Sequence, residues 1–309
     1  MDLDTDIRAM IDAALALPAR PLAEITVQQY RDGYRDRYRA RSVAPDMTVA
    51  ASALHIGDVP ATAYRPIDAA GPLPLVVYFH GGGFVLGDTA AYDAQSRCLA
   101  VRGRCVVLFV DYRLAPEHPF PAALDDARAA VVWAAANAAE LGADAGRRAV
   151  AGDSAGGNLA ANMALMAPER IALQVLLYPW VDARPYAGGP GYPSTTAFAE
   201  RHFLDQAVME WFTGHYLPDR ALATDPRVSP LLAPDHRGLP PAIVMTASHD
   251  PLRDMGAAYA ARLIEAGVDV DYRCVRGMVH NFLGHAGISA AAARALAALG
   301  DLLRTRLGL

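Results

Sequence analysis

Short apolar runs alternate with longer amphipathic stretches along most of the chain. The run LPLVVYF at residues 73–79 is almost continuously apolar, as is typical of a strand buried on both faces. Further strands are expected at residues 48–56, 60–64, 105–110, 172–177, 242–246 and 268–275, and in a short run that begins at Ala149. Apolar residues at helical spacing predict helices at residues 122–137, 252–266 and 289–306. This alternation predicts an α/β fold with a mostly parallel central sheet.

The first 42 residues are predicted to form two peripheral helices. Ile7, Met10 and Ile11 fall at helical spacing before two prolines break the pattern. A second helix is expected at residues 27–41, where three tyrosines four residues apart, starting at Tyr30, lie on one face. Such a row of tyrosines either packs on the domain or lines the mouth of a pocket, and the pattern leaves both open.

Residues 183–218 interrupt the alternation of strands and helices. The segment is too long for an ordinary connecting loop. Its aromatic residues are Tyr186, Tyr192, Phe198, Phe203, Trp211, Phe212 and Tyr216. Because a solvated loop does not leave so much aromatic surface exposed, we expect a lid insertion whose aromatic side chains pack on the domain.

Composition excludes several classes of function. The chain has 309 residues, of which 53% are hydrophobic and 20% are charged, as in an ordinary globular protein with a sizeable core. A net charge of −5 gives no reason to expect nucleic acid or an anionic membrane as a partner. All 28 basic residues are arginine. The absence of lysine excludes a Ser–Lys dyad, a Schiff base and a P-loop lysine.

Cysteine use and the start of the chain favour a cytoplasmic protein. Cys98, Cys105 and Cys274 are too few and too scattered for a disulfide framework or a metal site, and we expect buried free thiols. The chain begins with acidic residues where a signal peptide would be basic. No uninterrupted apolar stretch reaches the length of a membrane span, so no stable membrane insertion is expected.

The first candidate for chemistry is Ser154, in a G-x-S-x-G motif. Small apolar residues from Ala149 onwards predict a buried strand, and the Ala-rich segment that contains Asn158 and Leu159 predicts a helix. A serine on a sharp turn between a strand and a helix needs small residues two positions before and after it, and Gly152 and Gly156 occupy those positions. This context predicts a nucleophile elbow, with the serine at a helix N-terminus that favours negative charge.

A second motif, HGGGF, follows the apolar run that ends at Phe79. A dinucleotide fingerprint that starts at Gly81 would need a glycine where Leu86 stands, so that alternative fails. The other interpretation is an oxyanion loop of the HGGG type, which accompanies G-x-S-x-G in lipases and esterases. We expect backbone N–H groups of this loop to face the nucleophile.

The base and the acid of a catalytic triad are sought after the serine. In α/β-hydrolases the chain order is serine, acid, histidine, which favours His280 or His285 among the nine histidines; His280 is closer to the end of the last strand. The preceding strand is followed by Asp250 and Asp254. Asp250 lies where the strand ends, whereas Asp254, one turn later, is expected to cap the following helix or to form an ion pair at its start.

Four motifs together resemble the hormone-sensitive-lipase family of α/β-hydrolases, the bacterial family IV esterases: HGGGF, GDSAGG, DPLRD and VHNF. The resemblance includes DYRLAPEHPFPAALDD at residues 111–126 and VSPLLAPD from Val228, and extends from about residue 48 to the C-terminus. It implies an α/β-hydrolase fold with about eight strands, helices on both faces and a helical cap. The implied cap comprises residues 1–45 and 183–218, and the implied catalytic domain residues 46–182 and 219–309.

The same resemblance implies roles for individual residues. Ser154 is the implied nucleophile, Asp250 the acid and His280 the base. The implied oxyanion-hole donors are the N–H groups of Gly82, Gly83 and Ala155, and the expected substrate-binding residues are Phe84, Asp153, Trp211 and Phe212. One position departs from the family pattern: the residue after the histidine is usually glycine or similarly small, and here it is Asn281.

The expected function is hydrolysis of short- to medium-chain carboxylic esters without a metal or other cofactor. Hydrolysis of amides or carbamates, or a lyase or dehydratase reaction at the same site, stays open because the leaving group depends on pocket shape. A non-catalytic ligand-binding protein on this scaffold is disfavoured because such a protein is expected to lack a triad residue. The expected partner is a small-molecule ester, and the expected assembly is a monomer or homodimer.

Overall fold

The computed structural model describes residues 2–18, 20–167 and 171–308, and its centre is one eight-stranded sheet. The strand order is β1-β2-β4-β3-β5-β6-β7-β8. The strands are β1 (Val49–Ile56), β2 (Val59–Pro66), β3 (Leu73–Phe79), β4 (Val106–Val110), β5 (Ala143–Asp153), β6 (Leu173–Leu177), β7 (Ala242–His249) and β8 (Val270–Val279). Strands β3 to β8 run parallel to one another, while β2 pairs antiparallel with β1 and β4. The predicted mostly parallel α/β sheet is confirmed.

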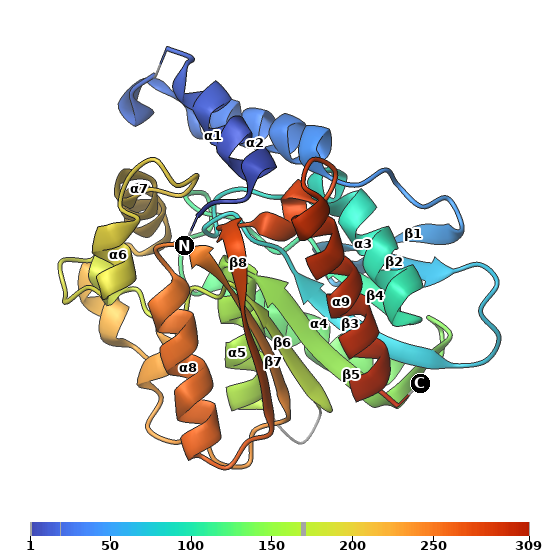
Figure 1. The fold of residues 1–309 in the computed structure, drawn as a ribbon. Coiled ribbons are helices and arrows are strands. Elements are labelled where there is room, and N and C mark those ends of the chain that lie inside the picture. Colours follow the sequence, from blue (N-terminus) through green and yellow to red (C-terminus); the bar gives the residue numbers. More distant parts are fainter. Residues whose placement is uncertain (1, 19, 168–170, 309) are drawn as a thin grey trace.

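Helices cover both faces of the sheet (Figure 1). On one face lie α4 (Ala122–Asn137), α5 (Ala155–Met166) and α8 (Arg253–Glu265). On the other face lie α3 (Thr89–Gly103) and α9 (Ala290–Arg306), and α1 (Thr5–Leu15) adds side chains to the same core layer from the end of the sheet. The sequence pattern missed α3, because most of its buried residues are small or polar, such as Ala94, Gln95 and Ser96, and give no apolar period.

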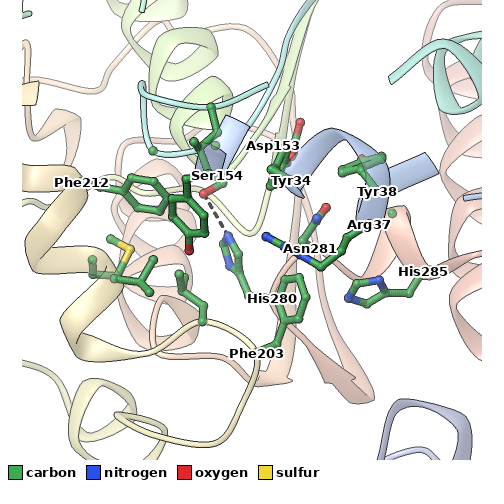
Figure 2. Close-up of a pocket in the computed structure, with 18 of the residues that line it drawn as sticks. Tyr34, Arg37, Tyr38, Asp153, Ser154, Phe203, Phe212, His280, Asn281 and His285 are labelled. Carbon is green, nitrogen blue, oxygen red and sulfur yellow. Dashed lines mark hydrogen bonds between the residues drawn. The ribbon is translucent and has the colours of Figure 1, made fainter. Parts of the chain in front are cut away.

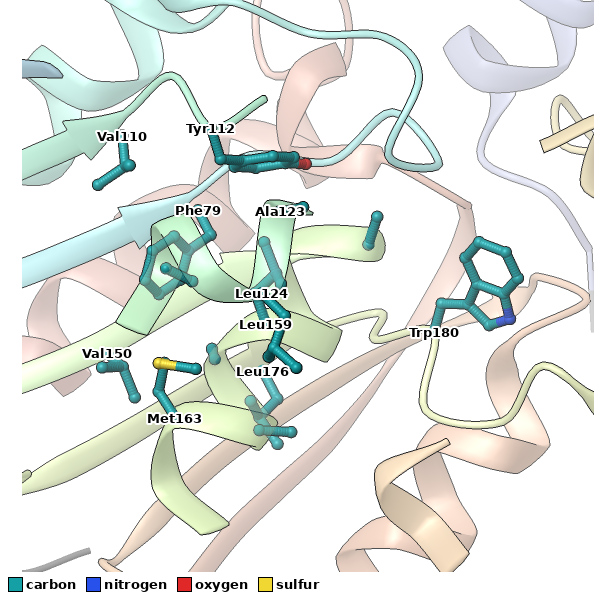
Figure 3. Close-up of a cluster of buried hydrophobic side chains, with 14 of the residues drawn as sticks. Phe79, Val110, Tyr112, Ala123, Leu124, Val150, Leu159, Met163, Leu176 and Trp180 are labelled. Carbon is teal, nitrogen blue, oxygen red and sulfur yellow. The ribbon is translucent and has the colours of Figure 1, made fainter. Parts of the chain in front are cut away.

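The hydrophobic core forms two layers, one on each side of the sheet. Along β3, Leu75, Val77 and Phe79 face one layer and Val76 and Tyr78 face the other, as the period of two in a strand requires. Figure 3 shows part of the first layer, in which β3, β4, β5 and β6 contribute side chains that meet α4 and α5. Burial on both faces explains why the central strands are continuously apolar.

Three strands beside the site are longer than the sequence pattern predicts, and one of them, β5, begins at Ala143 and not at Ala149. Strand β7 continues through Ser248 and His249, which are polar but buried, and β8 continues past Val275 to Val279. The pairing of β7 with β8 is irregular in this extension, where Gly277 has a positive φ of 74°. Such an irregularity interrupts the alternation of side chains from which a strand is predicted. The last strand therefore ends directly before His280.

The two segments expected to form a cap are both partly helical. Residues 183–218 contain α6 (Pro193–Ala197) and α7 (Gln206–Tyr216), and residues 1–45 contain α1 and α2 (Val27–Arg41); residues 1 and 19 lie outside the described part. Helices α1 and α2 cross the end of the sheet toward which the β8 arrow points (Figure 1). Helix α1 packs on the body through the buried Ile7 and Ile11, and Met10 packs there too.

Cys105 is buried and Cys98 is partly buried, but Cys274 is exposed, because β8 is an edge strand that is exposed on both faces there; the expectation of three buried thiols was wrong for Cys274. No helix in the described residues is long and apolar enough to cross a membrane. Within the same part of the chain, no cluster of three or more His, Cys, Asp or Glu side chains is arranged to hold a metal ion.

Candidate active site

Ser154 lies on the turn between β5 and α5. Its backbone has φ 54° and ψ −116°, a conformation that L-residues rarely adopt. The turn brings neighbouring backbones so close that a Cβ on Gly156 would collide with the carbonyl group of Phe79, and one on Gly152 with the carbonyl group of Gly156. The glycines are therefore required by backbone packing, as the motif predicts.

Three side chains from three separate segments form one hydrogen-bonded chain. The Nε2 atom of His280 lies 2.9 Å from Oγ of Ser154 (Figure 2), and its Nδ1 atom lies 2.8 Å from Oδ2 of Asp250. Asp250 is fully buried directly after β7, and its other oxygen accepts a hydrogen bond from the N–H of Leu252 at 2.8 Å. This bond fixes the carboxylate so that it orients the imidazole toward the serine.

The glycine-rich loop after β3 lies beside the serine. Gly82 and Gly83 have φ values of 112° and 62°, which an L side chain strongly disfavours. The N–H groups of Gly82, Gly83 and Ala155 donate to no acceptor among the described residues. Ala155 is the first residue of α5, where helix geometry leaves the N–H group without an intrahelical partner. The three N–H groups can therefore serve an oxygen of a bound molecule.

Asp153 connects this loop to the serine turn. Its carboxylate accepts hydrogen bonds from the hydroxyl groups of Tyr78 and Tyr92, both at 2.9 Å, and from the N–H of Gly81 at 3.0 Å. Burial raises the pKa of Asp153 to about 6, against the hydrogen bonds from the two tyrosines, which lower it. The residue before the serine thus holds the start of the oxyanion loop in place.

Asn281, the residue after the catalytic histidine, fits a position where the family usually has glycine or another small residue. Its backbone is left-handed, with φ 60° and ψ 31°. Asparagine tolerates this region better than any residue except glycine, so it can replace a small residue here. Its side-chain oxygen accepts a hydrogen bond from Tyr178 at 3.4 Å, and the ring of Tyr178 lies edge-on to His280.

The serine and histidine open into a cavity of about 140 Å³ (Figure 2). Helix α2 contributes Tyr30, Tyr34, Arg37, Tyr38 and Arg41 to its wall. Helix α7 and the residues before it contribute Phe203, Leu204, Val208, Met209 and Phe212. The cavity therefore lies between the catalytic side chains and the two segments that the sequence analysis assigned to a cap.

Comparison with known proteins assigns the chain to a family. A family model described as the alpha/beta hydrolase fold matches residues 76–284, more than half of the chain. The chain belongs to the α/β-hydrolase family. The expected kinship with hormone-sensitive-lipase-like esterases of bacterial family IV is confirmed.

Relatives and solved structures cover most of this α/β-hydrolase. The carboxylesterase NlhH of Mycobacterium tuberculosis is 44% identical over 245 residues, which cover 77% of this chain and 75% of the relative. The crystal structure of LAE6, an α/β-hydrolase enzyme from the metagenome of Lake Arreo, matches with a TM-score of 0.92 and 38% identity over 99% of both chains. The hyperthermophilic esterase of Pyrobaculum calidifontis matches with a TM-score of 0.90 and 37% identity over 99% of both chains.

Two of the expected substrate-binding residues lie away from the cavity of this α/β-hydrolase. Phe84 is buried beneath the loop and stacks on Tyr216, with ring centroids 3.8 Å apart. Trp211 does not line the cavity either, and it packs edge-on against Tyr30 and His215. Motif position and aromatic character alone did not reveal which way these rings point.

The other two expected residues, Asp153 and Phe212, do line the cavity. Asp153 is occupied by its three donors, whereas the ring of Phe212 lies where a Cβ on Gly83 would stand. Phe212 thus packs directly on the oxyanion loop and leaves room there only for glycine.

The cavity residues missed by the sequence analysis include three with basic side chains: Arg37, Arg41 and His285. The two arginines follow Tyr30 at intervals of seven and eleven residues, so they lie on the same helix face as the tyrosine row. That spacing was a usable signal for the arginines. His285 was considered only as an alternative base, and nothing in its spacing predicted that it would line the cavity wall.

Proposed function

We propose that the chain is a carboxylic-ester hydrolase that acts through an acyl-enzyme on Ser154. The observation that carries the proposal is the hydrogen-bonded chain from Asp250 through His280 to Ser154, beside three N–H groups that have no partner in the described residues. Relatives whose names describe them as a carboxylesterase, an arylesterase and an esterase support the same activity.

In the first half of the reaction, Ser154 attacks the ester carbonyl. His280 accepts the hydroxyl proton as the oxygen attacks, while Asp250 holds the imidazole in the required tautomer and stabilises its charged form. The N–H groups of Gly82, Gly83 and Ala155 bind the negative oxygen of the tetrahedral intermediate, and loss of one such donor typically costs about 3–4 kcal/mol in the barrier. His280 then returns the proton to the departing alcohol.

In the second half, water cleaves the acyl-enzyme. His280 takes a proton from the water as it attacks the acyl carbonyl, and the same N–H groups bind the second oxyanion. The proton returns to Oγ of Ser154 as the carboxylic acid leaves. Every proton moves between the substrate, water and side chains of this chain.

Residues 1–45 and 183–218 form the proposed cap, with residues 46–182 and 219–309 as the catalytic domain; residues 1, 19, 168–170 and 309 lie outside the described part. Within the cap, α2 and α7 meet through Tyr30, whose ring contacts both Trp211 and Phe212. The cavity beneath the proposed cap has a volume of about 140 Å³, and this small volume favours short to medium acyl chains over long ones. The cytoplasmic location and the monomeric or homodimeric state stay predictions.

An ester series tests the proposal, with ethyl or nitrophenyl esters graded by acyl length and an aryl amide of a short acid beside them. The expected result is the highest kcat/KM on a short or medium chain, little turnover of emulsified long-chain triglyceride, and slow or no cleavage of the amide. Faster cleavage of the amide than of the matched ester would assign an amidase instead. Binding without turnover of any ester would assign a non-catalytic protein.

A further inference from the structure

The cavity beside Ser154 has two chemically different sides. In Figure 2, Phe212 lies on one side of the Ser154–His280 pair, and Arg37 and His285 lie on the other. Leu204, Val208 and Met209 also line the cavity, and they come from α7, which carries Phe212, and from the residues directly before it. The second side carries two guanidinium groups, because Arg41 lines the cavity close to both Arg37 and His285. An ester that spans the serine therefore meets an apolar wall with one part and a cationic wall with the other.

The two cavity arginines have no acidic partner among the described residues, unlike Arg31 and Arg35 on the same helix. Arg31 pairs with Glu117 at 2.6 Å and Arg35 pairs with Asp88 at 2.6 Å. Neither Arg37 nor Arg41 forms an ion pair or a hydrogen bond through its side chain with any described residue. Both guanidinium groups lie over aromatic rings instead, Arg37 at 6.0 Å from the Tyr30 centroid and Arg41 at 5.6 Å from that of Phe203.

Arg41 is held in a position that costs electrostatic free energy. It is partly buried, and burial together with the charge of Arg37 lowers the pKa of its guanidinium group. Two cations that face one cavity without a counter-ion are stabilised when an anion binds between them. Asp153 is the acidic side chain among the described cavity-lining residues, and its carboxylate already accepts hydrogen bonds from Tyr78, Tyr92 and Gly81.

His285 is an independent sign of a polar ligand on the same side. Its side chain is 1% exposed, and neither ring nitrogen has a hydrogen-bond partner among the described residues. Burial, and then the charge of Arg41, lower the pKa of His285 to about 3, so the ring is neutral at pH 7 and carries one donor and one acceptor. A buried polar group without a partner is costly, and a polar ligand group in the cavity would satisfy it.

We propose that the preferred ester substrates carry a carboxylate, as in a half-ester of a dicarboxylic acid, and that Arg37 and Arg41 bind this group. The planar guanidinium fork matches a carboxylate, and the neutral His285 ring is placed on the same wall to donate a hydrogen bond. The inference rests on the proposed esterase function, because it names the class of ester that this site takes. The apolar wall near Phe212 then receives the uncharged part of the ester.

The test compares monoethyl esters of dicarboxylic acids of increasing length with the same esters in which a carboxamide replaces the carboxylate. The measured quantity is the ratio of kcat/KM for each matched pair, in the wild type and in the Arg37→Gln, Arg41→Gln and double variants. We expect the wild type to prefer the carboxylate and the double variant to lose about tenfold or more of that ratio, the size of a charge-assisted hydrogen bond. The loss should appear mainly in KM, and Arg41→Lys should restore part of the ratio.

Arg39→Gln is the matched control, because Arg39 lies on the same helix but lines a different surface groove and not the cavity. Its ratio should equal that of the wild type. A wild-type ratio of one or below, or a ratio that the double variant and the control lower equally, overturns the inference while the esterase function stands.

Binding measurements separate the two proposals. Titration calorimetry with a free dicarboxylic acid on the Ser154→Ala variant, with and without the two arginine substitutions, reads the anion site without turnover. Binding that the arginine substitutions remove supports the anion site even if no ester is hydrolysed, whereas equal binding by both proteins contradicts it.

Discussion

The two aspartates of the DPLRD segment differ in what they contact. Asp250 holds the imidazole of His280, while Asp254 accepts a hydrogen bond from the N–H of Ser194 at 2.8 Å and pairs with Arg253. The sequence analysis separated them by one turn of chain and expected Asp254 to cap a helix or form an ion pair at its start, and the ion pair is confirmed. Ser194 lies in α6, so Asp254 connects the proposed cap to α8.

Replacing each aspartate by asparagine should therefore give opposite signatures. Asp250→Asn should lower kcat by about ten thousand-fold with little change in stability, because an amide cannot stabilise the charged imidazole and favours the wrong tautomer. Asp254→Asn should lower the melting temperature and leave most of kcat. Ester kinetics and thermal unfolding of both variants check this. The reverse ranking in kcat would transfer the acid role to Asp254.

Asp153 predicts a pH dependence of stability. The folded protein keeps the proton of Asp153 up to pH of about 6, whereas an unfolded chain releases it near pH 4. This group therefore stabilises the fold fully below pH 4, and that contribution is lost as pH rises through 6, a change of about 3 kcal/mol. Asp153→Asn lacks the dependence, so its unfolding free energy should rise relative to the wild type between pH 4 and pH 7. A difference that stays constant in urea unfolding would contradict the assigned pKa.

At the residue scale, the sequence predicted groups whose position follows from a motif. Ser154, Asp250 and His280 come from different segments, yet each directly follows a strand, and parallel strands end at one edge of a sheet. The sequence did not predict which way individual aromatic rings point. Phe84 and Phe212 are both phenylalanines near the loop, and only tertiary packing decides that the second one lines the cavity.

At the scale of elements, hydrogen bonds hold α2 against the rest of the molecule. Arg31 donates through Nε to the carbonyl of Val85 at 2.8 Å and through Nη2 to that of Ala115 at 2.9 Å. The hydroxyl of Tyr38 donates to Gln95 at 2.7 Å. Since these partners lie in and around the oxyanion loop and α3, we infer that α2 is a fixed wall of the cavity.

Arg31→Ala should accordingly destabilise the protein by about 1–3 kcal/mol, since it removes two hydrogen bonds to partly buried carbonyls as well as an ion pair. Arg39→Ala on the same helix is the control and should fall within about 0.5 kcal/mol of the wild type. Urea unfolding measures both. Equal stability of the two variants would contradict the account of α2 as an anchored wall.

Element boundaries were predicted where large apolar residues dominate and missed where they do not. Strand β3 was predicted over its full length because every residue in it is buried and apolar. Helix α3 and the polar end of β7 were missed, because small or polar side chains such as Ser96 and Ser248 are buried there through packing and hydrogen bonds. Ser248, for example, accepts from the N–H of Gly277 at 2.9 Å.

At the scale of the whole molecule, the sheet brings the functional segments together. The serine turn, the oxyanion loop and the acid follow β5, β3 and β7, and the histidine follows β8, so all four lie at the same edge. Helices α1 and α2 and residues 183–218 then cover that edge from two distant parts of the chain (Figure 1). The alternating pattern predicted the sheet, whereas the contact between the two covering segments depends on side-chain packing that no local pattern encodes.

The central claim is that Ser154 is the nucleophile of an ester hydrolase. Its most direct test is mass spectrometry of the protein after treatment with a phosphonate ester, together with ester kinetics of the Ser154→Ala variant. We expect one covalent adduct, on Ser154, with loss of activity in step with labelling, and a fall in kcat of about four to six orders of magnitude in a variant that folds normally. An adduct on another serine, or a Ser154→Ala variant that retains ester turnover, would contradict the claim.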